Sequence, residues 1–242
     1  MNRQNYASEP VGTQQLRGGA RSRLPAGTLP FRYLRRAAAP VGARPATRWT
    51  GQICPIVLTD ITAFSAHRRS DEDRLILRRT MYDMLQRAFE GAGLMWRELH
   101  TEDRGDGTLI VVPPDTPASA VAARALGHLA AALRRHNQSA SDALRMQLRV
   151  ALHAGPVIRD AQGVTGHAIN QTARLVQARI LRKLLSETRA DLGVIVSAYI
   201  YDYVIRQHEG QPMDATPYRK IRFRVKESAL TAWIHLAGVA SE

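Results

Sequence analysis

The predicted fold starts from one apolar run, Ile53-Cys54-Pro55-Ile56-Val57-Leu58-Thr59-Asp60. Its apolar residues are contiguous, which is typical of a short strand buried on both faces. The run closes on the carboxylate of Asp60. It therefore predicts a buried strand over 53–59 that carries an acid at its end.

Helix and strand patterns alternate on the C-terminal side of this run. Apolar spacing, or a composition rich in Ala and Leu, predicts helices over 71–91, 118–135, 167–186 and 198–207. Strand-like runs cover 94–102, 108–112, 144–153, 192–197, 221–225 and 229–236. The order is βαββαβ, then αβα, then a β-hairpin. This order predicts an α+β fold with a ferredoxin-like βαββαβ core and extra α/β elements.

The first fifth of the chain differs from the rest in composition. Residues 1–50 contain nine Arg and a single acid, Glu9, without a sustained period of 2 or 3.6. We expect a disordered, Arg-rich tail over 1–50 and one domain over 51–242. The net charge of +13 favours polyanionic partners, namely nucleic acid, an acidic membrane surface or nucleotide phosphates. Because the tail holds eight of these charges, nine Arg less one Glu, the domain is a weak candidate for nucleic-acid binding.

Composition also excludes several classes of site. The chain has one cysteine, Cys54, so it forms no intramolecular disulfide and no cysteine-based zinc site. No apolar stretch approaches the length of a membrane span, and no apolar segment after the basic N-terminus is long enough for a secretory signal. We therefore expect a cytoplasmic protein with no membrane partner.

Two acids stand out by their predicted positions. Asp60 ends the first strand, and Asp106 lies in a tight hairpin turn over 103–107. In a βαββ arrangement these strands are neighbours in the sheet, so carboxylates 46 positions apart in the chain converge. Two such acids can hold a pair of divalent cations. Each acid alone is better explained as a strand cap or a turn former, but the pair favours a metal site.

Five segments, in order, resemble the motifs of class III adenylate and guanylate cyclases: 57–65, 105–107, 148–157, 166–175 and 225–226. The first contains the family's Asp-Ile-x-x-Phe pattern, and the second its Gly-Asp-Gly turn. The resemblance extends from about 53 to 236 and implies a class III cyclase-like fold for the whole predicted domain.

The resemblance also implies roles for single residues. Asp60 and Asp106, with the carbonyl of Ile61, would hold two Mg²⁺ or Mn²⁺ ions per site. Asn170 would orient the ribose, and Arg174 would neutralise charge that develops on the α-phosphate. Taken alone, an Asn and an Arg four residues apart are better explained as a solvated helix face.

Two further positions and the oligomeric state follow from the same resemblance. Phe64 would contact the substrate, and Lys226 would contact phosphate unless it is an ordinary turn lysine. In this family the metal-binding acids and the Asn/Arg helix of one site come from opposite subunits. The resemblance therefore implies a head-to-tail homodimer with two shared sites.

The positions that read the base depart from the family pattern. Glu102 occupies one of them, as in guanylate cyclases, and Gly163 occupies the other without offering a side chain. A carboxylate at Glu102 accepts hydrogen bonds from base donors, which favours GTP or UTP over ATP and CTP. The alternative is that Glu102 pairs with Arg104 on the same strand face. Altered pockets occur in the pyrimidine cyclases of Pycsar antiphage systems and in cyclase-like domains that have lost activity.

The function expected from these residues is conversion of a ribonucleoside triphosphate to a 3′,5′-cyclic nucleotide and pyrophosphate. The product would serve signalling, including antiphage defence. The alternative is a catalytically silent module for dimerisation or nucleotide sensing, which loss of Asp60, Asp106, Asn170 or Arg174 would have favoured; none is lost. A third hypothesis is a nucleic-acid-binding protein that uses the tail.

Overall fold

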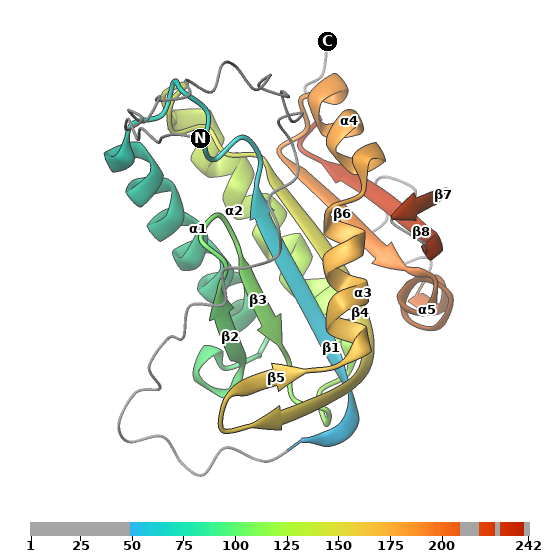
Figure 1. Cartoon of the computed structure of the whole chain (residues 1–242). Coiled ribbons are helices and arrows are strands. Elements are labelled where there is room, and N and C mark those ends of the chain that lie inside the picture. The colour runs from blue at the N-terminus through green and yellow to red at the C-terminus, as the bar shows by residue number, and fades with distance from the viewer. Residues whose placement is uncertain (1–48, 209–217, 226–227, 240–242) are drawn as a thin grey trace, which may run out of the picture. The chain divides into compact units, whose positions relative to one another are not determined.

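A computed structural model of the chain describes residues 49–208, 218–225 and 228–239 (Figure 1). The strands are β1 (Thr50–Ile61), β2 (His100–Asp103), β3 (Thr108–Val111), β4 (Leu148–Asp160), β5 (Gly163–Thr165), β6 (Leu192–Ser197), β7 (Arg219–Val225) and β8 (Ser228–Ala237). They form one sheet in the order β2-β3-β1-β4-β6-β8-β7, and β5 pairs with β4. The pairings are antiparallel except that of β4 with β6.

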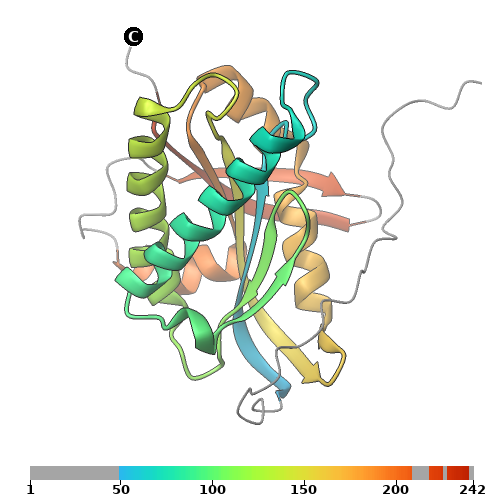
Figure 2. The ribbon, with the colours of Figure 1, turned by 90° about the vertical axis from the view of Figure 1, so that its left-hand side faces the viewer.

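Two pairs of helices cover the two faces of this sheet. Helices α1 (Asp71–Gly91) and α2 (Leu126–Ser139) lie across one face, and α3 (His167–Val176) and α4 (Arg179–Thr188) lie across the other (Figures 1 and 2). A one-turn helix α5 (Ala198–Ile200) follows β6. The predicted α+β class and the βαββαβ order are confirmed, and the expected tail falls almost wholly within 1–48, outside the described residues.

The face under α1 and α2 holds a large apolar cluster. Ser70 caps α1, because its hydroxyl accepts a hydrogen bond from the Asp73 amide at 3.1 Å and the Asp73 carboxylate accepts one from the Ser70 amide at 2.8 Å. One stripe of α1 is then buried against β1, β3 and β4: Leu77, Met81, Met84, Leu85, Ala88 and Phe89.

Alternate residues of the same strands point to the other face. Leu58 of β1 and Ala151 of β4 pack with Leu175 of α3 and Leu181 of α4. Because strand side chains alternate between faces, Asp60 lies on this face, two residues beyond Leu58. The sheet thus carries the acid to the side of α3 and α4.

The strands differ from the prediction in three places. The strand expected over 144–153 is β4, which begins at Leu148 and extends to Asp160. The expected strand over 94–102 begins as a tight helical turn, Trp96–Glu98, and only β2 is extended. Trp96 is held in that turn by an edge-on contact with Phe89, at 5.9 Å between ring centroids. The short strand β5, which pairs with the end of β4, was not predicted.

Three predicted helices differ from the structure: one is divided into two helices, and two are regular over only part of the predicted range. The helix expected over 167–186 is two helices, because Ala178 adopts a non-helical backbone (φ −57°, ψ 122°) and is fully buried between them. The helix expected over 118–135 begins with a wide turn, Ala120–Ala125, and continues regularly as α2. The helix expected over 198–207 is regular only in α5.

Candidate active site

Two carboxylates meet where β1 ends beside the turn between β2 and β3. Asp60 lies near the end of β1 and Asp106 lies in the turn. The Ile61 amide donates a hydrogen bond to the Asp106 carbonyl at 2.8 Å, which holds the turn against the strand. A Cβ on Gly107 would lie 1.9 Å from the Thr59 carbonyl oxygen, so only glycine permits this approach. The structure thus brings the two acids together.

The two carboxylates also interact electrostatically. The pKa of the Asp106 carboxyl is raised above its usual range, first by burial and then by the negative charge of Asp60. A nearby positive charge, that of Arg149, partly offsets the shift. A partly buried pair of acids with this repulsion favours a bound cation.

Arg149 of β4 is a site residue that sequence reasoning missed. It pairs with Asp60 across the β1–β4 ladder, and its Nη2 donates to Asp60 Oδ1 at 2.5 Å. Its Nη1 lies 3.4 Å from the carbonyl of Val176, the last residue of α3. The guanidinium side chain is only 9% exposed. An Arg within an apolar strand pattern was the available signal, but only the register with Asp60 gives it meaning.

The loop after β1 is fixed by a buried arginine. Arg69 is 3% exposed, and its guanidinium donates to the carbonyls of Thr62 and Ala63 at 3.2 and 2.9 Å. It also reaches the carbonyls of Ala143 and Arg145, at 3.2 and 2.8 Å. Phe64 lies in this loop and packs against the cluster under α1 and α2. The backbone around Ile61 is therefore held rigidly beside the acids.

These residues fit divalent cations that prefer oxygen ligands. The described part of the chain contains no group of three or more His, Cys, Asp or Glu that could hold a metal. Asp60 and Asp106 would therefore need a backbone oxygen, the role implied for Ile61, and oxygens from water or phosphate. Mg²⁺ and Mn²⁺ accept such a ligand set.

Asn170 and Arg174 lie one helical turn apart on α3. The opposite side of this helix, Ala168, Thr172 and Leu175, is buried against the sheet. Asn170 is exposed and Arg174 is half-buried. Among the described residues, Asn170 makes no hydrogen bond to either acid. Lys226, the expected phosphate contact, lies outside the described residues.

The two predicted base-reading positions are neighbours in space although they are 61 positions apart in the sequence. A Cβ on Gly163 would lie 3.1 Å from Oε1 of Glu102. Glu102 Oε2 accepts a hydrogen bond from Arg104 Nη2 at 2.8 Å, and Oε1 lies 2.9 Å from Nε2 of His100. In this structure Glu102 therefore forms the pair with Arg104 that the sequence left open.

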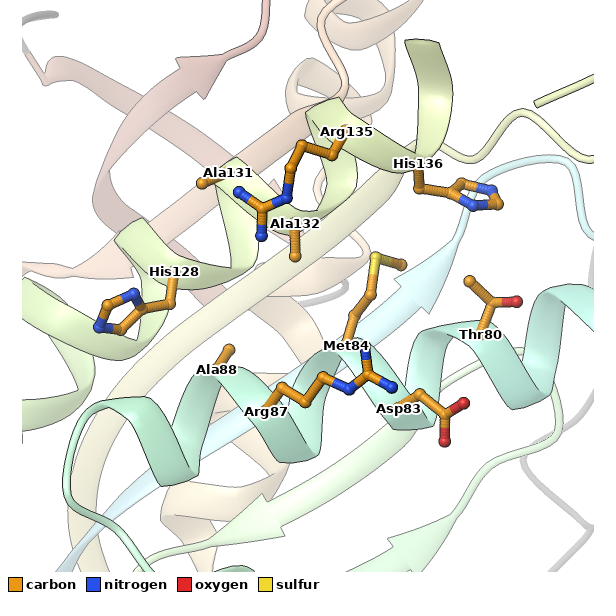
Figure 3. Close-up of a pocket in the computed structure, with 10 residues that line it drawn as sticks. All are labelled: Thr80, Asp83, Met84, Arg87, Ala88, His128, Ala131, Ala132, Arg135 and His136. Atoms are coloured by element: carbon orange, nitrogen blue, oxygen red, sulfur yellow. The ribbon is translucent and has the colours of Figure 1, made fainter. Parts of the chain in front are cut away.

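A separate hollow lies between α1 and α2 (Figure 3). Its volume is about 470 Å³, and Arg87, His128 and Arg135 stand on its rim. None of the residues predicted from the sequence lines it. Because α1 and α2 cover the face opposite Asp60, this hollow is not part of the carboxylate site.

The chain is similar in structure to solved cyclase domains. The guanylyl cyclase Cya2 superposes with a TM-score of 0.55 at 17% identity, over 80% of this chain and 95% of that chain. The catalytic core of a rhodopsin-guanylyl cyclase with converted specificity, in complex with ATPalphaS, gives 0.54 at 15% identity over 78% and 97%. A non-canonical dimeric guanylyl cyclase domain of the RhoGC fusion protein from the aquatic fungus Blastocladiella emersonii gives a TM-score of 0.52 at 17% identity, over 77% of this chain and 97% of that chain.

No protein-family model and no curated protein sequence matches the chain. At these identities the structural similarity establishes the fold alone. The fold is that of class III adenylyl and guanylyl cyclase catalytic domains.

Proposed function

We propose that this chain, which has the class III cyclase fold, is a nucleotide cyclase. It would convert a ribonucleoside triphosphate to a 3′,5′-cyclic nucleotide and pyrophosphate. The observation that carries the proposal is the meeting of Asp60 and Asp106 at the end of β1, with Arg149 beside them. A purely structural strand end does not need two partly buried acids whose charges repel.

In this reaction the ribose 3′-oxygen attacks the α-phosphorus, and the bond from that phosphorus to the bridging oxygen of the β-phosphate breaks. Divalent cations, when bound, acidify the 3′-hydroxyl and stabilise the charge on the leaving pyrophosphate. Asp60 and Asp106 would hold them, with the Ile61 carbonyl. Arg149, which lies beside Asp60, would donate to phosphate oxygens of the bound substrate.

The remaining roles fall on α3. Asn170 would orient the ribose by hydrogen bonds, and Arg174 would stabilise the charge that develops on the α-phosphate. Asn170 is exposed on the side of α3 away from the sheet. This placement supports a site completed by a second copy, as a head-to-tail homodimer with two shared sites.

The test of activity is direct. The purified full chain is incubated with each of the four ribonucleoside triphosphates and Mn²⁺, and the products are identified by mass spectrometry. We expect a 3′,5′-cyclic nucleotide and pyrophosphate in equal amounts. Nucleotide binding without any cyclic product would instead support the silent nucleotide-sensing module.

The shared site has its own test, which uses two inactive variants. Asp60→Ala and Arg174→Ala damage opposite halves of a site, so a mixed dimer keeps one intact site. After subunit exchange, equal mixing should restore about a quarter of wild-type activity, because about half of the dimers are mixed and each has one working site. Confirmed exchange without rescue would contradict shared sites.

Other features of the proposal rest on the resemblance. A cytoplasmic signalling role, including antiphage defence, stays a prediction, as does nucleic-acid binding by residues 1–50. Among the described residues, no helix has the length and apolar character needed to cross a bilayer.

A further inference from the structure

The cluster around Glu102 has the composition of a recognition site. His100, Glu102 and Arg104 follow at alternate positions along β2 and into its turn, so they share one face. Gly163 of β5 faces them. The side chains of His100, Glu102 and Arg104 are 13%, 25% and 28% exposed, so they line a partly open wall.

Within this cluster the acceptors of Glu102 are already engaged. Oε1 lies 2.9 Å from His100 Nε2, and Oε2 accepts from Arg104 Nη2 at 2.8 Å. The pKa of the carboxyl is lowered, first by the hydrogen bond with His100 and also by the charge of Arg104 and the Val164 amide, against the effect of burial. Glu102 is therefore an ionised group that orients its neighbours.

Arg104 is the group with donors to spare. A guanidinium has five N–H groups, and one contact with Glu102 is present among the described residues. Its Nε is buried and has no partner in the described part of the chain. Because Nε is buried, a base that reaches the partly exposed side chain would meet the terminal Nη groups, which carry the other four N–H donors.

We propose that Arg104, held in place by Glu102, reads the base of the substrate by donating to two adjacent acceptors on one edge. Guanine offers O6 and N7, which match the fork of an arginine, and cytosine offers O2 and N3. Adenine has no edge with two adjacent acceptors, and in uracil the N3–H donor lies between O2 and O4. This inference rests on the proposed cyclase function and assigns the base class to it.

Gly163 completes the recognition wall by its lack of a side chain. Its φ of +138° is a conformation that other residues rarely adopt, and an added Cβ would press on Glu102 Oε1. Gly163→Ala should therefore displace Glu102, and with it Arg104.

The pair CTP and UTP separates the two modes of recognition. If Glu102 read the base directly, UTP would exceed CTP; if Arg104 reads it, CTP exceeds UTP. The full chain is assayed with all four ribonucleotides and Mn²⁺. For the wild type we expect kcat/KM for GTP and CTP to exceed that for ATP and UTP by about tenfold or more.

Substitutions test whether Arg104 causes this ranking of the four nucleotides. Arg104→Leu should reduce the differences among nucleotides to about threefold or less while turnover persists. The matched control is Arg78→Leu, because Arg78 pairs with the neighbouring carboxylate of Asp103 at 2.6 Å and lies outside the cluster. It should keep the wild-type ranking. A ranking led by ATP or UTP, or one that Arg104→Leu leaves unchanged, would overturn the inference.

Binding calorimetry with 3′-deoxynucleoside triphosphates keeps the two proposals apart. A wild type that forms no cyclic product with any nucleotide contradicts the cyclase function. In that case tighter binding of the guanine and cytosine analogues, lost in Arg104→Leu, still supports Arg104 as the base reader. Equal binding of all four analogues, or none, contradicts it.

Discussion

The two faces of the sheet carry different kinds of residue. The side chains under α1 and α2 form an apolar cluster, mainly of Leu, Val, Ala, Met, Ile and Phe. The face under α3 and α4 also holds apolar residues, but among them are Asp60, Arg149 and His153, all on β1 or β4. Because successive strand residues point to opposite faces, the same two strands supply both. Both faces therefore contribute buried apolar residues, and the face under α3 and α4 also carries the candidate site.

The largest effect that tests this division is loss of turnover. Asp60→Ala and Asp106→Ala should each lower kcat about a thousandfold or more, because a metal ligand contributes several kcal/mol to the transition state. Circular dichroism should show an intact fold for both variants, since neither side chain belongs to an apolar cluster. Asp60→Ala should also lower the free energy of unfolding, because it leaves the guanidinium of Arg149, only 9% exposed, without its carboxylate partner. Either variant with wild-type turnover would contradict the two-acid site.

A substitution in the cluster under α1 and α2 should lower stability and leave turnover unchanged. Leu85→Ala removes a fully buried side chain of α1 and should lower the free energy of unfolding by about 2–5 kcal/mol. Because α1 does not contact the acids, kcat per folded molecule should stay near the wild-type value. Urea unfolding and an active-site titration measure the two quantities. A large fall in kcat without a loss of stability would break the comparison.

The buried histidine of the chemical face gives a pH-dependent test. Burial is the main cause that lowers the pKa of His153 to about 4, and its Nδ1 lies 2.8 Å from Ser197 Oγ. Because the pKa of His153 in the folded state lies below its unfolded value of about 6.5, stability is fully present above pH 6.5. It decreases as the pH falls from there toward the folded-state pKa. Between pH 7 and pH 4.5, His153 should therefore cost the protein about 2–3 kcal/mol.

The His153→Gln variant should lose that part of the pH dependence of urea unfolding. The exposed His67 offers a matched control, because His67→Gln should keep the wild-type dependence. Equal pH dependence in wild type and His153→Gln would show that His153 is charged, or hydrated, in the folded chain.

The smallest predicted effect is a change in unfolding temperature, which should have opposite signs for two nearby acids. The pKa of Asp106 is raised, first by burial, so its ionised form penalises the folded state once the pH exceeds the usual carboxyl range. Without divalent ions, Asp106→Asn should raise the unfolding temperature at pH 7.5 by a few degrees and change it little at pH 3.

Asp103 provides the opposite sign three residues away. Burial alone would raise its pKa, but the hydrogen bond and charge of Arg78, with hydrogen bonds from the Gly105 amide and Tyr82, lower it overall. Asp103→Asn should therefore lower the unfolding temperature at pH 7.5. Thermal scans of both variants that shift in the same direction would contradict the electrostatic assignment.

The fold was largely predictable because the order of helices and strands, which determines the topology, follows from the apolar spacing along the sequence. The predicted bounds 71–91 match α1, because the apolar spacing of the sequence corresponds to the stripe that α1 buries. The break between α3 and α4 was not predictable, because the apolar spacing continues through Ala178 and only packing interrupts the helix. The turn at Trp96 depends in the same way on a contact with Phe89.

The candidate site was likewise predictable only in part. The convergence of Asp60 and Asp106 followed from topology, which fixes where strand ends lie. The role of Arg149 required the register that places it opposite Asp60, and the pairing of Glu102 with Arg104 required side-chain conformations. Sequence patterns contain neither.

The anchoring of the loop at Arg69 has a consequence for how such a site survives mutation. Its guanidinium contacts main-chain carbonyls of residues 62, 63, 143 and 145, and every residue type supplies a carbonyl. Neighbouring side chains are therefore free to diverge over generations as long as one arginine persists. Substitutions at residues 62, 63, 143 and 145 should therefore leave the backbone beside the acids in place, so the shape of this loop can persist where its sequence does not.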